Sequence, residues 1–319
     1  MTTPIAVRTA HPPGQVVGVE AKDGASITAL VLDADAARLD TVSWVPGSSI
    51  SVRSITLDAA VDPFILSAGV TERFIAISDG HRQALVERAT GSVHQLPEFL
   101  APGVFSPDGG WLISATADGL LRTRLGTPPA VYEIQPMLLA RLDNPVSVAV
   151  IPGKTSARFT VAVGCYGSVD LVDVGEFGAY PTDAGSRQVS PEGLPYDPVH
   201  ISVPTALKSS PTNYVFVTDE SRAALSAVHL ASGLSLNCPF EARNYGTVGP
   251  VVPSLDGEAC LVATRDGMWW RWTPGSPPHP QPPPGGRPLL WHADRVLVWH
   301  EATFELRDES VPDPRQVTE

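Results

Sequence analysis

The sequence has only three cysteines and no long apolar run. Cys165, Cys238 and Cys260 are an odd number at unrelated spacings, which argues against a disulfide framework. Two of them lie in strand-like apolar runs, VAVGCYG and EACLVAT, so we expect reduced, buried thiols. The first residues, MTTPIAVRTAHPPGQ, lack the basic and apolar regions of an export signal, and no apolar run reaches membrane length. We therefore expect a cytoplasmic protein that does not contact a membrane.

Basic residues are also scarce. Lys and Arg number 22 against 34 Asp and Glu, which gives a formal net charge of -12. Such a surface repels a phosphate backbone, so we expect no nucleic-acid partner and favour a basic or neutral one. Apolar residues are plentiful, at 43%, and the 32 prolines and 27 glycines stand between short apolar runs. This pattern predicts a globular chain of many short elements.

The stretch FSPDGGWLISATADGLLRTRL, residues 105–125, predicts a β-hairpin. Trp111 to Ala115 is strand-like, and Asp118-Gly119 separates it from the alternating run Leu120 to Leu125. An Asp-Gly pair between two such runs is a strong hairpin signal. The same shape recurs, with varying clarity, in runs that begin at Ile27, Phe74, Thr160, Val215, Cys260 and Arg295. The hairpin is thus one of seven copies.

The turns of these copies are regularly spaced. Each has an acidic residue or a tyrosine, and these follow one another at intervals averaging about 44 residues, the length of one four-stranded propeller blade. They are Asp35, Asp79, Asp118, Tyr166, Glu220, Asp266 and Glu301. The alternation with period two excludes helical repeats of similar length. The sequence therefore predicts an all-β fold over residues 1–319, a single seven-bladed β-propeller of four-stranded antiparallel blades.

A further apolar run precedes most hairpins, and we expect it to be the innermost strand. These runs are PFILSAG, APGVFSP, PVSVAVIPG, PVHISVP, VGPVVPS and PLLWHA, and blades then start near residues 15, 62, 101, 145, 198, 247 and 287. GSVHQLP and AVYEIQP are expected to be outermost strands of the second and third blades. In the last copy, Pro312 and Pro314 make a fourth strand unfavourable. We expect residues 4–10, which include IAVRT, to complete that blade and close the ring.

Two stretches resemble the middle of WD-repeat β-propeller blades, FSPDGGWLISATADGLLRTR and PSLDGEACLVATRDGMWWRW. Both stretches have the same order of elements. An apolar strand is followed by a Pro-Asp-Gly or Leu-Asp-Gly turn, a second strand, an Asp-Gly turn and a third strand. No blade keeps the Gly-His or Trp-Asp pairs of the family, and Thr123-Arg124 and Arg271-Trp272 stand at the equivalent positions. The resemblance to this family is therefore that of a divergent member. It implies a rigid platform for proteins or peptides, although some propellers are enzymes.

In WD-like blades, the turn between the second and third strands lies on the face that commonly receives partners. Here those turns carry Tyr166 together with Asp33 and the six acidic turn residues above, and the acidic residues form a possible ring that would attract a basic peptide or a polyamine-like ligand. The alternative, which we favour, is that each Asp caps its own turn. Nearby arginines could neutralise the ring: Arg82, Arg122, Arg222 and Arg265.

Aromatic residues offer a second candidate surface. The connection from residue 175 to 198 is the largest insertion, and its Phe177, Tyr180 and Tyr196 either form a recognition element or cover a blade edge. In the strand after Met268, Trp270 and Trp272 are expected to face one neighbouring blade and Trp269 the other. The proline-rich stretch from 274 to 288 is expected to be extended and exposed, and to replace the outer strand of the sixth blade or loop off it.

Signs of catalysis are weak. His200 and His292, on innermost strands, and Asp197 nearby are too few for a zinc or iron site. No nucleophile elbow, phosphate loop or Cys-x-x-Cys motif is present. We expect no cofactor and no metal, and we predict a monomeric, non-catalytic interaction scaffold or regulatory module. The alternative is a small-molecule-binding or catalytic propeller with the two histidines at its central channel.

Overall fold

The described part of the chain consists of β-strands and turns. In the computed structural model the described residues are 5–8, 15–22, 26–33, 37–44, 51–59, 67–71, 73–78, 83–97, 103–117, 119–126, 137–155, 158–175, 178–179, 186–191, 199–202, 213–219, 224–239, 248–254, 256–264, 267–281, 287–292, 295–300 and 303–308. No helix occurs among them. Accordingly, a search of these residues finds no helix with the length and apolar character needed to traverse a bilayer.

The described strands form seven antiparallel sheets that follow one another along the chain. Sheet 1 consists of β2 (Gln15–Lys22), β3 (Ser26–Asp33), β4 (Arg38–Trp44) and β5 (Ser51–Thr56). Sheet 2 consists of β6 (Ser67–Val70), β7 (Phe74–Ser78), β8 (Gln83–Glu87) and β9 (Val93–Gln95). Sheet 3 consists of β10 (Gly103–Phe105), β11 (Trp111–Thr116), β12 (Gly119–Arg124) and β13 (Met137–Ala140).

The next three sheets keep this order. Sheet 4 consists of β14 (Ser147–Thr155), β15 (Arg158–Gly164) and β16 (Val169–Gly175), with β17 (Gly178–Ala179) and β18 (Ser186–Val189) both paired to β16. Sheet 5 consists of β19 (Val199–Ser202), β20 (Tyr214–Asp219), β21 (Leu225–His229) and β22 (Ser235–Asn237). Sheet 6 consists of β23 (Val248–Pro253), β24 (Cys260–Thr264), β25 (Trp269–Trp272) and β26 (His279–Gln281).

Sheet 7 combines the two ends of the sequence. It consists of β27 (Arg287–His292), β28 (Arg295–His300), β29 (Thr303–Asp308) and β1 (Ile5–Arg8). The N-terminal strand β1 pairs with β29 in antiparallel register, from Ile5 opposite Leu306 to Arg8 opposite Thr303. The strand-like run near the start of the sequence thus supplies the fourth strand that the last hairpin lacks.

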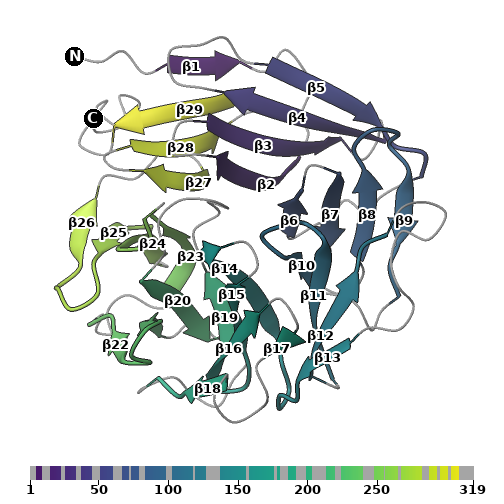
Figure 1. Ribbon diagram of the computed structural model, residues 1–319. Coiled ribbons are helices and arrows are strands. Elements are labelled where there is room, and N and C mark those ends of the chain that lie inside the picture. Colours follow the sequence, from purple (N-terminus) through teal and green to yellow (C-terminus); the bar gives the residue numbers. More distant parts are fainter. Residues whose placement is uncertain are drawn as a thin grey trace, which may run out of the picture.

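The first strand of each sheet lies toward the centre of the molecule. Figure 1 shows the sheets around a common centre in chain order, and the first strands of consecutive sheets contact one another from β2 to β27. An isolated parallel bridge joins Ser254, just after β23, to Trp291 of β27, so these two inner strands run in the same direction. The runs predicted to be innermost strands therefore overlap with the strands that lie there.

One outer strand differs from expectation, and another agrees with one of two stated alternatives. In sheet 3 the fourth strand is Met137–Ala140 rather than the preceding run AVYEIQP, which lies outside the described residues. Leu139 of this strand is buried against sheet 4, and that burial depends on a neighbouring sheet. In sheet 6 the proline-rich stretch itself supplies the fourth strand, where Pro280 lies opposite Trp270. A proline is tolerated there because an outermost strand does not need every N–H for pairing.

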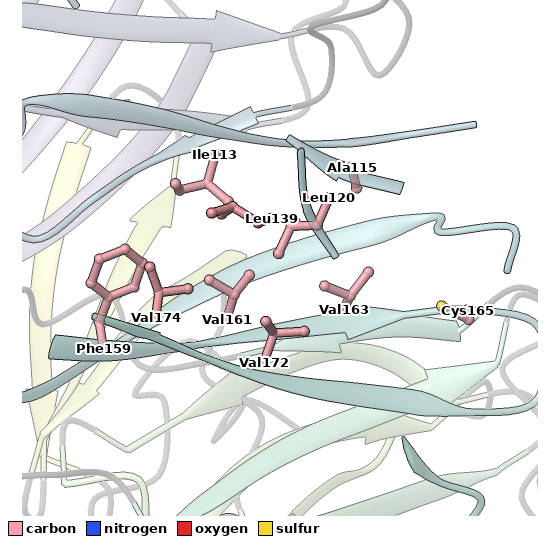
Figure 2. Close-up of a cluster of buried hydrophobic side chains, with 10 residues drawn as sticks. All are labelled: Ile113, Ala115, Leu120, Leu139, Phe159, Val161, Val163, Cys165, Val172 and Val174. Carbon is pink, nitrogen blue, oxygen red and sulfur yellow. The ribbon is translucent and has the colours of Figure 1, made fainter. Parts of the chain in front are cut away.

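The hydrophobic core is divided into layers between consecutive sheets. In β7, Phe74 and Ala76 pack toward sheet 3, whereas Ile75 and Ile77 pack toward sheet 1. This is the period of two expected of a strand that is buried on both faces. Figure 2 shows the layer between sheets 3 and 4: Ile113, Ala115, Leu120, Leu139, Phe159, Val161, Val163, Cys165, Val172 and Val174. Each large side chain fully buried in this way stabilises the fold by about 1.5–3 kcal/mol.

The tryptophans of β25 divide between two layers as predicted. Trp270 and Trp272 pack with sheet 5, where Phe216 meets Trp272 edge to face at a ring-centroid distance of 6.0 Å. Trp269 packs on the other side, in the layer that contains Trp291 of sheet 7. The predicted packing role of these aromatic residues is therefore confirmed.

Polar contacts connect the sheets at the end where the second and third strands turn. The Gln83 side chain, at the start of β8, donates from Nε2 to the Gly103 carbonyl of the next sheet at 2.7 Å. Cys165, just after β15, accepts a backbone hydrogen bond from Val199 N of sheet 5 at 3.1 Å. The Val199 carbonyl accepts another from Ser147 Oγ at 2.7 Å. This turn therefore lies beside the strand that enters the next sheet, as in WD-like blades.

Such close contact leaves no room for a side chain at Gly164. A Cβ atom there would lie 2.1 Å from the Val199 carbonyl oxygen and 2.4 Å from Ser147 Oγ. We expect Gly164→Ala to lower the free energy of unfolding by about 1–3 kcal/mol, because two sheets must separate to admit the methyl group. Urea unfolding followed by tryptophan fluorescence measures this. The matched control is Gly110→Ala, whose Cβ would meet nothing closer than the Asp108 side chain at 3.5 Å; equal losses in both variants would contradict the explanation.

The three cysteines are free and buried, as predicted. Cys165 donates from Sγ to the buried Asp170 carboxylate at 3.3 Å. Burial, together with the Asp170 charge, raises the pKa of Cys165 to about 12, and burial also raises the pKa of Asp170 itself. Burial raises the pKa of Cys260, helped by Cys238. The thiols of Cys165 and Cys260 therefore remain protonated at neutral pH.

We expect no reaction of the native protein with a thiol reagent such as Ellman's reagent at pH 8, because only thiolates attack it. After denaturation in guanidinium chloride all three cysteines should react. Ala117→Cys, at an exposed turn position, is the positive control and should react in the native state. Rapid labelling of the native protein with only its three natural cysteines would contradict their burial. For Cys165 the pKa is raised from 9.0 to about 12. Its stabilising effect is thus full below pH 9 and declines as pH rises toward 12.

Candidate interaction surface

Most of the residues predicted to form a site lie outside the described residues. This holds for Asp35, Asp79, Asp118, Glu220, Asp266 and Glu301, and for the insertion aromatics Phe177, Tyr180 and Tyr196. The acidic ring and the aromatic recognition element therefore stay predictions. Among the predicted contact residues, only Tyr166 and Asp33 have described side chains, and Tyr166 is 39% exposed.

Three polar side chains described at the turns between second and third strands form hydrogen bonds within those turns. Asp219 is fully buried, and its Oδ1 accepts a hydrogen bond from Ala224 N across the turn at 3.1 Å. The hydroxyls of Thr116 and Thr264 each donate to a carbonyl across their turns at 3.1 Å. These contacts agree with the capping role that we favoured over ligand binding.

In sheet 1 the acidic residue at this turn has a cationic neighbour. Asp33 Oδ2 lies 3.2 Å from Arg38 Nη2, and Nε of the same guanidinium lies 3.2 Å from the buried Asp40 carboxylate. Arg38 thus bridges two carboxylates on β3 and β4. This local charge compensation makes Asp33 a weaker candidate for attracting a basic ligand.

Apolar side chains are exposed at two of these turns. Tyr166 lies in the turn between β15 and β16, and Met268, which is 42% exposed, lies in the turn between β24 and β25. Since the sheets share one strand order around the centre, both turns belong to the same end of the molecule. We call the surface carrying Tyr166 and Met268 the turn face. The sequence had indicated Tyr166, whereas the exposure of Met268 was missed because its tryptophan neighbours are largely buried.

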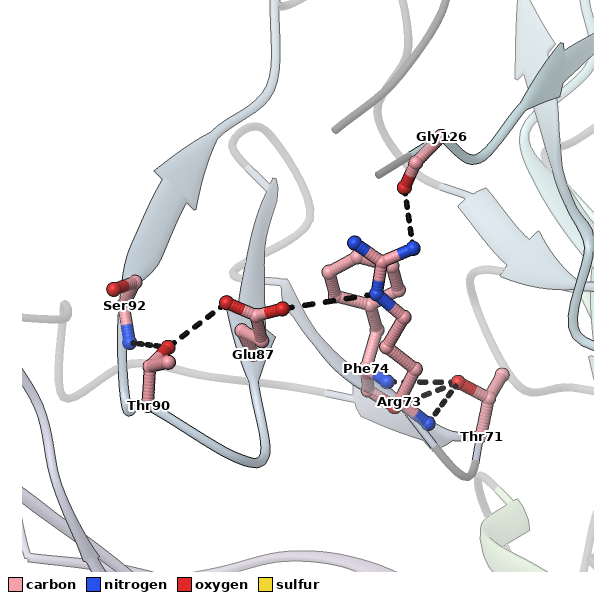
Figure 3. Close-up of polar contacts among 7 residues, drawn as sticks. All are labelled: Thr71, Arg73, Phe74, Glu87, Thr90, Ser92 and Gly126. Atoms are coloured by element: carbon pink, nitrogen blue, oxygen red, sulfur yellow. Dashed lines mark hydrogen bonds and ion pairs between the residues drawn. The ribbon is translucent and has the colours of Figure 1, made fainter. Parts of the chain in front are cut away.

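The opposite end of the sheets is occupied by structural polar contacts. Figure 3 shows Arg73, in the turn between β6 and β7, whose Nη1 donates to the Gly126 carbonyl at 2.5 Å and whose Nε lies 3.7 Å from Glu87. Glu87 also accepts a hydrogen bond from Thr90 at 2.9 Å. At this opposite end of the sheets, Leu234 is an apolar residue with 59% exposure, and it lies in the turn between β21 and β22.

A repeated motif shapes two turns at that same end. In FSPDGGW, Ser106 Oγ donates to Asp108 Oδ1, which also accepts from Gly110 N, while Trp111 N donates to Ser106 Oγ at 3.0 Å. The stretch PSLDGEA repeats all three bonds with Ser254, Asp256, Glu258 and Ala259. The Ser-x-Asp-Gly pattern that carries the resemblance to WD repeats is therefore a turn-stabilising motif.

Arg122 was expected near the acidic turns, and this expectation was wrong. It lies in the middle of β12 with 5% exposure, and its guanidinium stacks on the Trp111 indole ring at 3.9 Å. Arg82, Arg222 and Arg265 lie outside the described residues. The error arose because nearness to a turn in sequence does not decide in which direction along the strand a long side chain extends.

The two channel histidines are described only in their backbones. His200 belongs to β19 and His292 to β27, both first strands of their sheets, and the positions of their side chains lie outside the description. Within the described segments, no group of three or more His, Cys, Asp or Glu residues is arranged to hold a metal ion. No described contact therefore favours the catalytic alternative.

Comparison with known proteins identifies the fold. No protein-family profile and no curated protein matches the sequence. Among solved structures, the β-propeller domain of Cps50 (Swd1) from Myceliophteria thermophila matches with a TM-score of 0.54 at 12% identity, over 94% of this chain and 98% of that one. A chain of a mitotic checkpoint complex matches with a TM-score of 0.55 at 11% identity, over 98% and 95%. Kluyveromyces lactis Hsv2 matches with a TM-score of 0.52 at 10% identity, over 82% and 75%. The chain has the fold of a WD-repeat-like β-propeller.

Proposed function

We propose that this protein is a non-catalytic interaction module that binds a protein or peptide on the turn face. The observation that carries the proposal is the exposure of Tyr166 and Met268 at one end of the molecule. Neighbouring polar groups such as Asp219 are occupied in capping their turns. Tyrosine and methionine are enriched at protein interfaces. Tyrosine buries a large apolar area with few rotatable bonds, and methionine adapts its flexible side chain to the partner.

The fold and the charge of the chain agree with this role. One of the similar structures is part of a mitotic checkpoint complex, so a propeller of this shape occurs in a protein assembly. The net charge of -12 favours a basic or neutral partner, which would be steered toward the surface by long-range attraction. The predicted acidic turn residues, among them Asp118 and Asp266, would add to that attraction. Free cysteines suit a reducing compartment, and cytoplasmic location stays a prediction.

Rigid attachment of the turns supports the use of this face for recognition. The turn that carries Tyr166 is held by the contact between Cys165 and Asp170 and by the backbone bond from Val199 to Cys165. A contact residue on a rigid turn loses little conformational entropy when it binds. The backbone at Tyr166 is therefore already ordered, so binding need not lose further conformational entropy to position it.

The first test is capture of partners from native lysate by the tagged protein, with identification by mass spectrometry. We expect a specific protein whose retention falls about tenfold in Tyr166→Ala and in Met268→Ser, because each variant removes an apolar contact at the centre of an interface. Titration of the purified partner by fluorescence anisotropy gives the change in Kd. Retention should also decrease at high salt if the partner is basic.

The matched control is Leu234→Ser, which removes an exposed apolar side chain at the opposite end of the sheets. It should bind the partner as the wild type does. Thermal unfolding of all three variants should match the wild type, since the altered side chains are exposed. A partner that binds Tyr166→Ala and Met268→Ser at full affinity would refute the turn face as the binding surface.

A further inference from the structure

Arg122 is a buried cation that forms no ion pair with any carboxylate among the described residues. In β12 it pairs across the sheet with Ile113 on one side and Met137 on the other, and it is 5% exposed. Its Nη2 faces the Met137 sulfur at 3.6 Å, and its Nε has no hydrogen-bond partner. A thioether is a weak acceptor. The guanidinium is therefore held by its stacking on Trp111 and by little else.

Other arginines in the molecule show what is missing here. Arg38 contacts two carboxylates at 3.2 Å, and Arg73 contacts Glu87 and the Gly126 carbonyl. Burial lowers the pKa of Arg122, and the exposed Asp108 offsets this only in part. A guanidinium nevertheless stays protonated at neutral pH, so the buried charge persists. Burying a charge without a partner costs free energy, and that cost is recovered if an anion binds.

Exposed apolar side chains stand on both faces of β13, the outermost strand of sheet 3. Met137 lies opposite Arg122 and shares its face, whereas Leu138 lies opposite Leu121 on the other face. Met137 is 50% exposed and Leu138 is 45% exposed. Both residues belong to β13. Among the described strands, none pairs with the outer edge of β13. An unpaired edge with apolar side chains is a template for an added strand. Met137 has a flexible side chain, which allows it to turn away from Nη2 when a better acceptor arrives.

We propose that the outer edge of sheet 3 binds an extended acidic segment of another protein, whose Asp or Glu carboxylate pairs with Arg122 while its apolar neighbours cover Met137 and Leu138. A planar guanidinium and a carboxylate form two parallel hydrogen bonds, which fixes the register of the bound segment. Arg124, exposed on the same strand, adds attraction. This site differs from the turn face in its location and in the charge of its ligand, and neither proposal depends on the other.

The experiment uses a phage-displayed library of random peptides selected on the full-length protein. The recovered peptides are synthesised with a fluorescent label, and their Kd values are measured for the wild type, Arg122→Met, Arg124→Met and Tyr166→Ala. Acidic peptides are disfavoured in general by the net charge of -12. Enrichment of Asp or Glu beside an apolar residue would therefore reflect a specific site.

We expect a class of acidic peptides whose Kd rises at least about tenfold in Arg122→Met, the loss of one charged hydrogen-bonded pair. Replacing the peptide's Glu by Gln, or its Asp by Asn, should raise the Kd by a similar factor in the unaltered protein, which makes the result independent of how any variant folds. Arg124→Met, the matched control two residues along the strand, should raise the Kd by less than threefold. Tyr166→Ala should leave this class unaffected, which separates the site from the turn face.

The proposal is overturned if the selection yields no acidic peptides, or if the acidic peptides bind Arg122→Met as tightly as the wild type. It is also overturned if Arg124→Met weakens binding as much as Arg122→Met, since the attraction would then be non-specific. Stability provides a further readout. The Tm of Arg122→Met should equal or exceed that of the wild type, because an unpaired buried charge is replaced by an apolar side chain of similar length; a lower Tm would show that Arg122 stabilises the fold rather than a bound ligand.

Discussion

Burial of both faces of a sheet, seen among the described residues in sheets 2 to 6, is the constraint on which this structure depends. Phe74 and Ala76 of one strand pack against the following sheet, while Ile75 and Ile77 pack against the preceding one. A sheet that is apolar on both faces cannot be stable in water by itself, so each needs a neighbour on either side. Strand edges need partners as well as faces. The N-terminal strand Ile5–Arg8 pairs with β29 and so covers the outer edge of the last hairpin. The ring of sheets in Figure 1 follows from this mutual covering.

Dense packing between sheets also determines how the turns are presented. At Gly164 the backbones of two sheets approach so closely that even a methyl group does not fit. Hydrogen bonds from Gln83 to Gly103 and from Ser147 to Val199 connect sheets at that same end. The turn that carries Tyr166 is thus fixed relative to its neighbours before any ligand binds. Rigid placement of this kind lowers the entropic cost of binding on the turn face that we propose as the interaction surface.

Charge is distributed unevenly over this acidic protein. Arg38 and Arg73 have carboxylate neighbours and contribute to the fold where they stand. Arg122 lies in the layer between two sheets, where its guanidinium contacts the Trp111 indole ring and the Met137 thioether. A natural protein can keep such an unfavourable group when function repays its cost in stability. The contrast between these arginines connects the electrostatics of the fold to the second binding surface that we propose.

The sequence by itself predicted the seven hairpins, most of the inner strands and the order of the sheets, because alternation with period two and Asp-Gly turns are local signals. It also assigned Trp269 to one layer and Trp270 and Trp272 to the other, since side chains alternate along a strand. Only the tertiary structure decided that Met137–Ala140 is the outer strand of sheet 3, because Leu139 is buried by a neighbouring sheet. It likewise decided that Arg122 is buried and that Met268 is exposed. Burial and exposure of individual side chains depend on contacts between segments distant in sequence, and no local pattern encodes them.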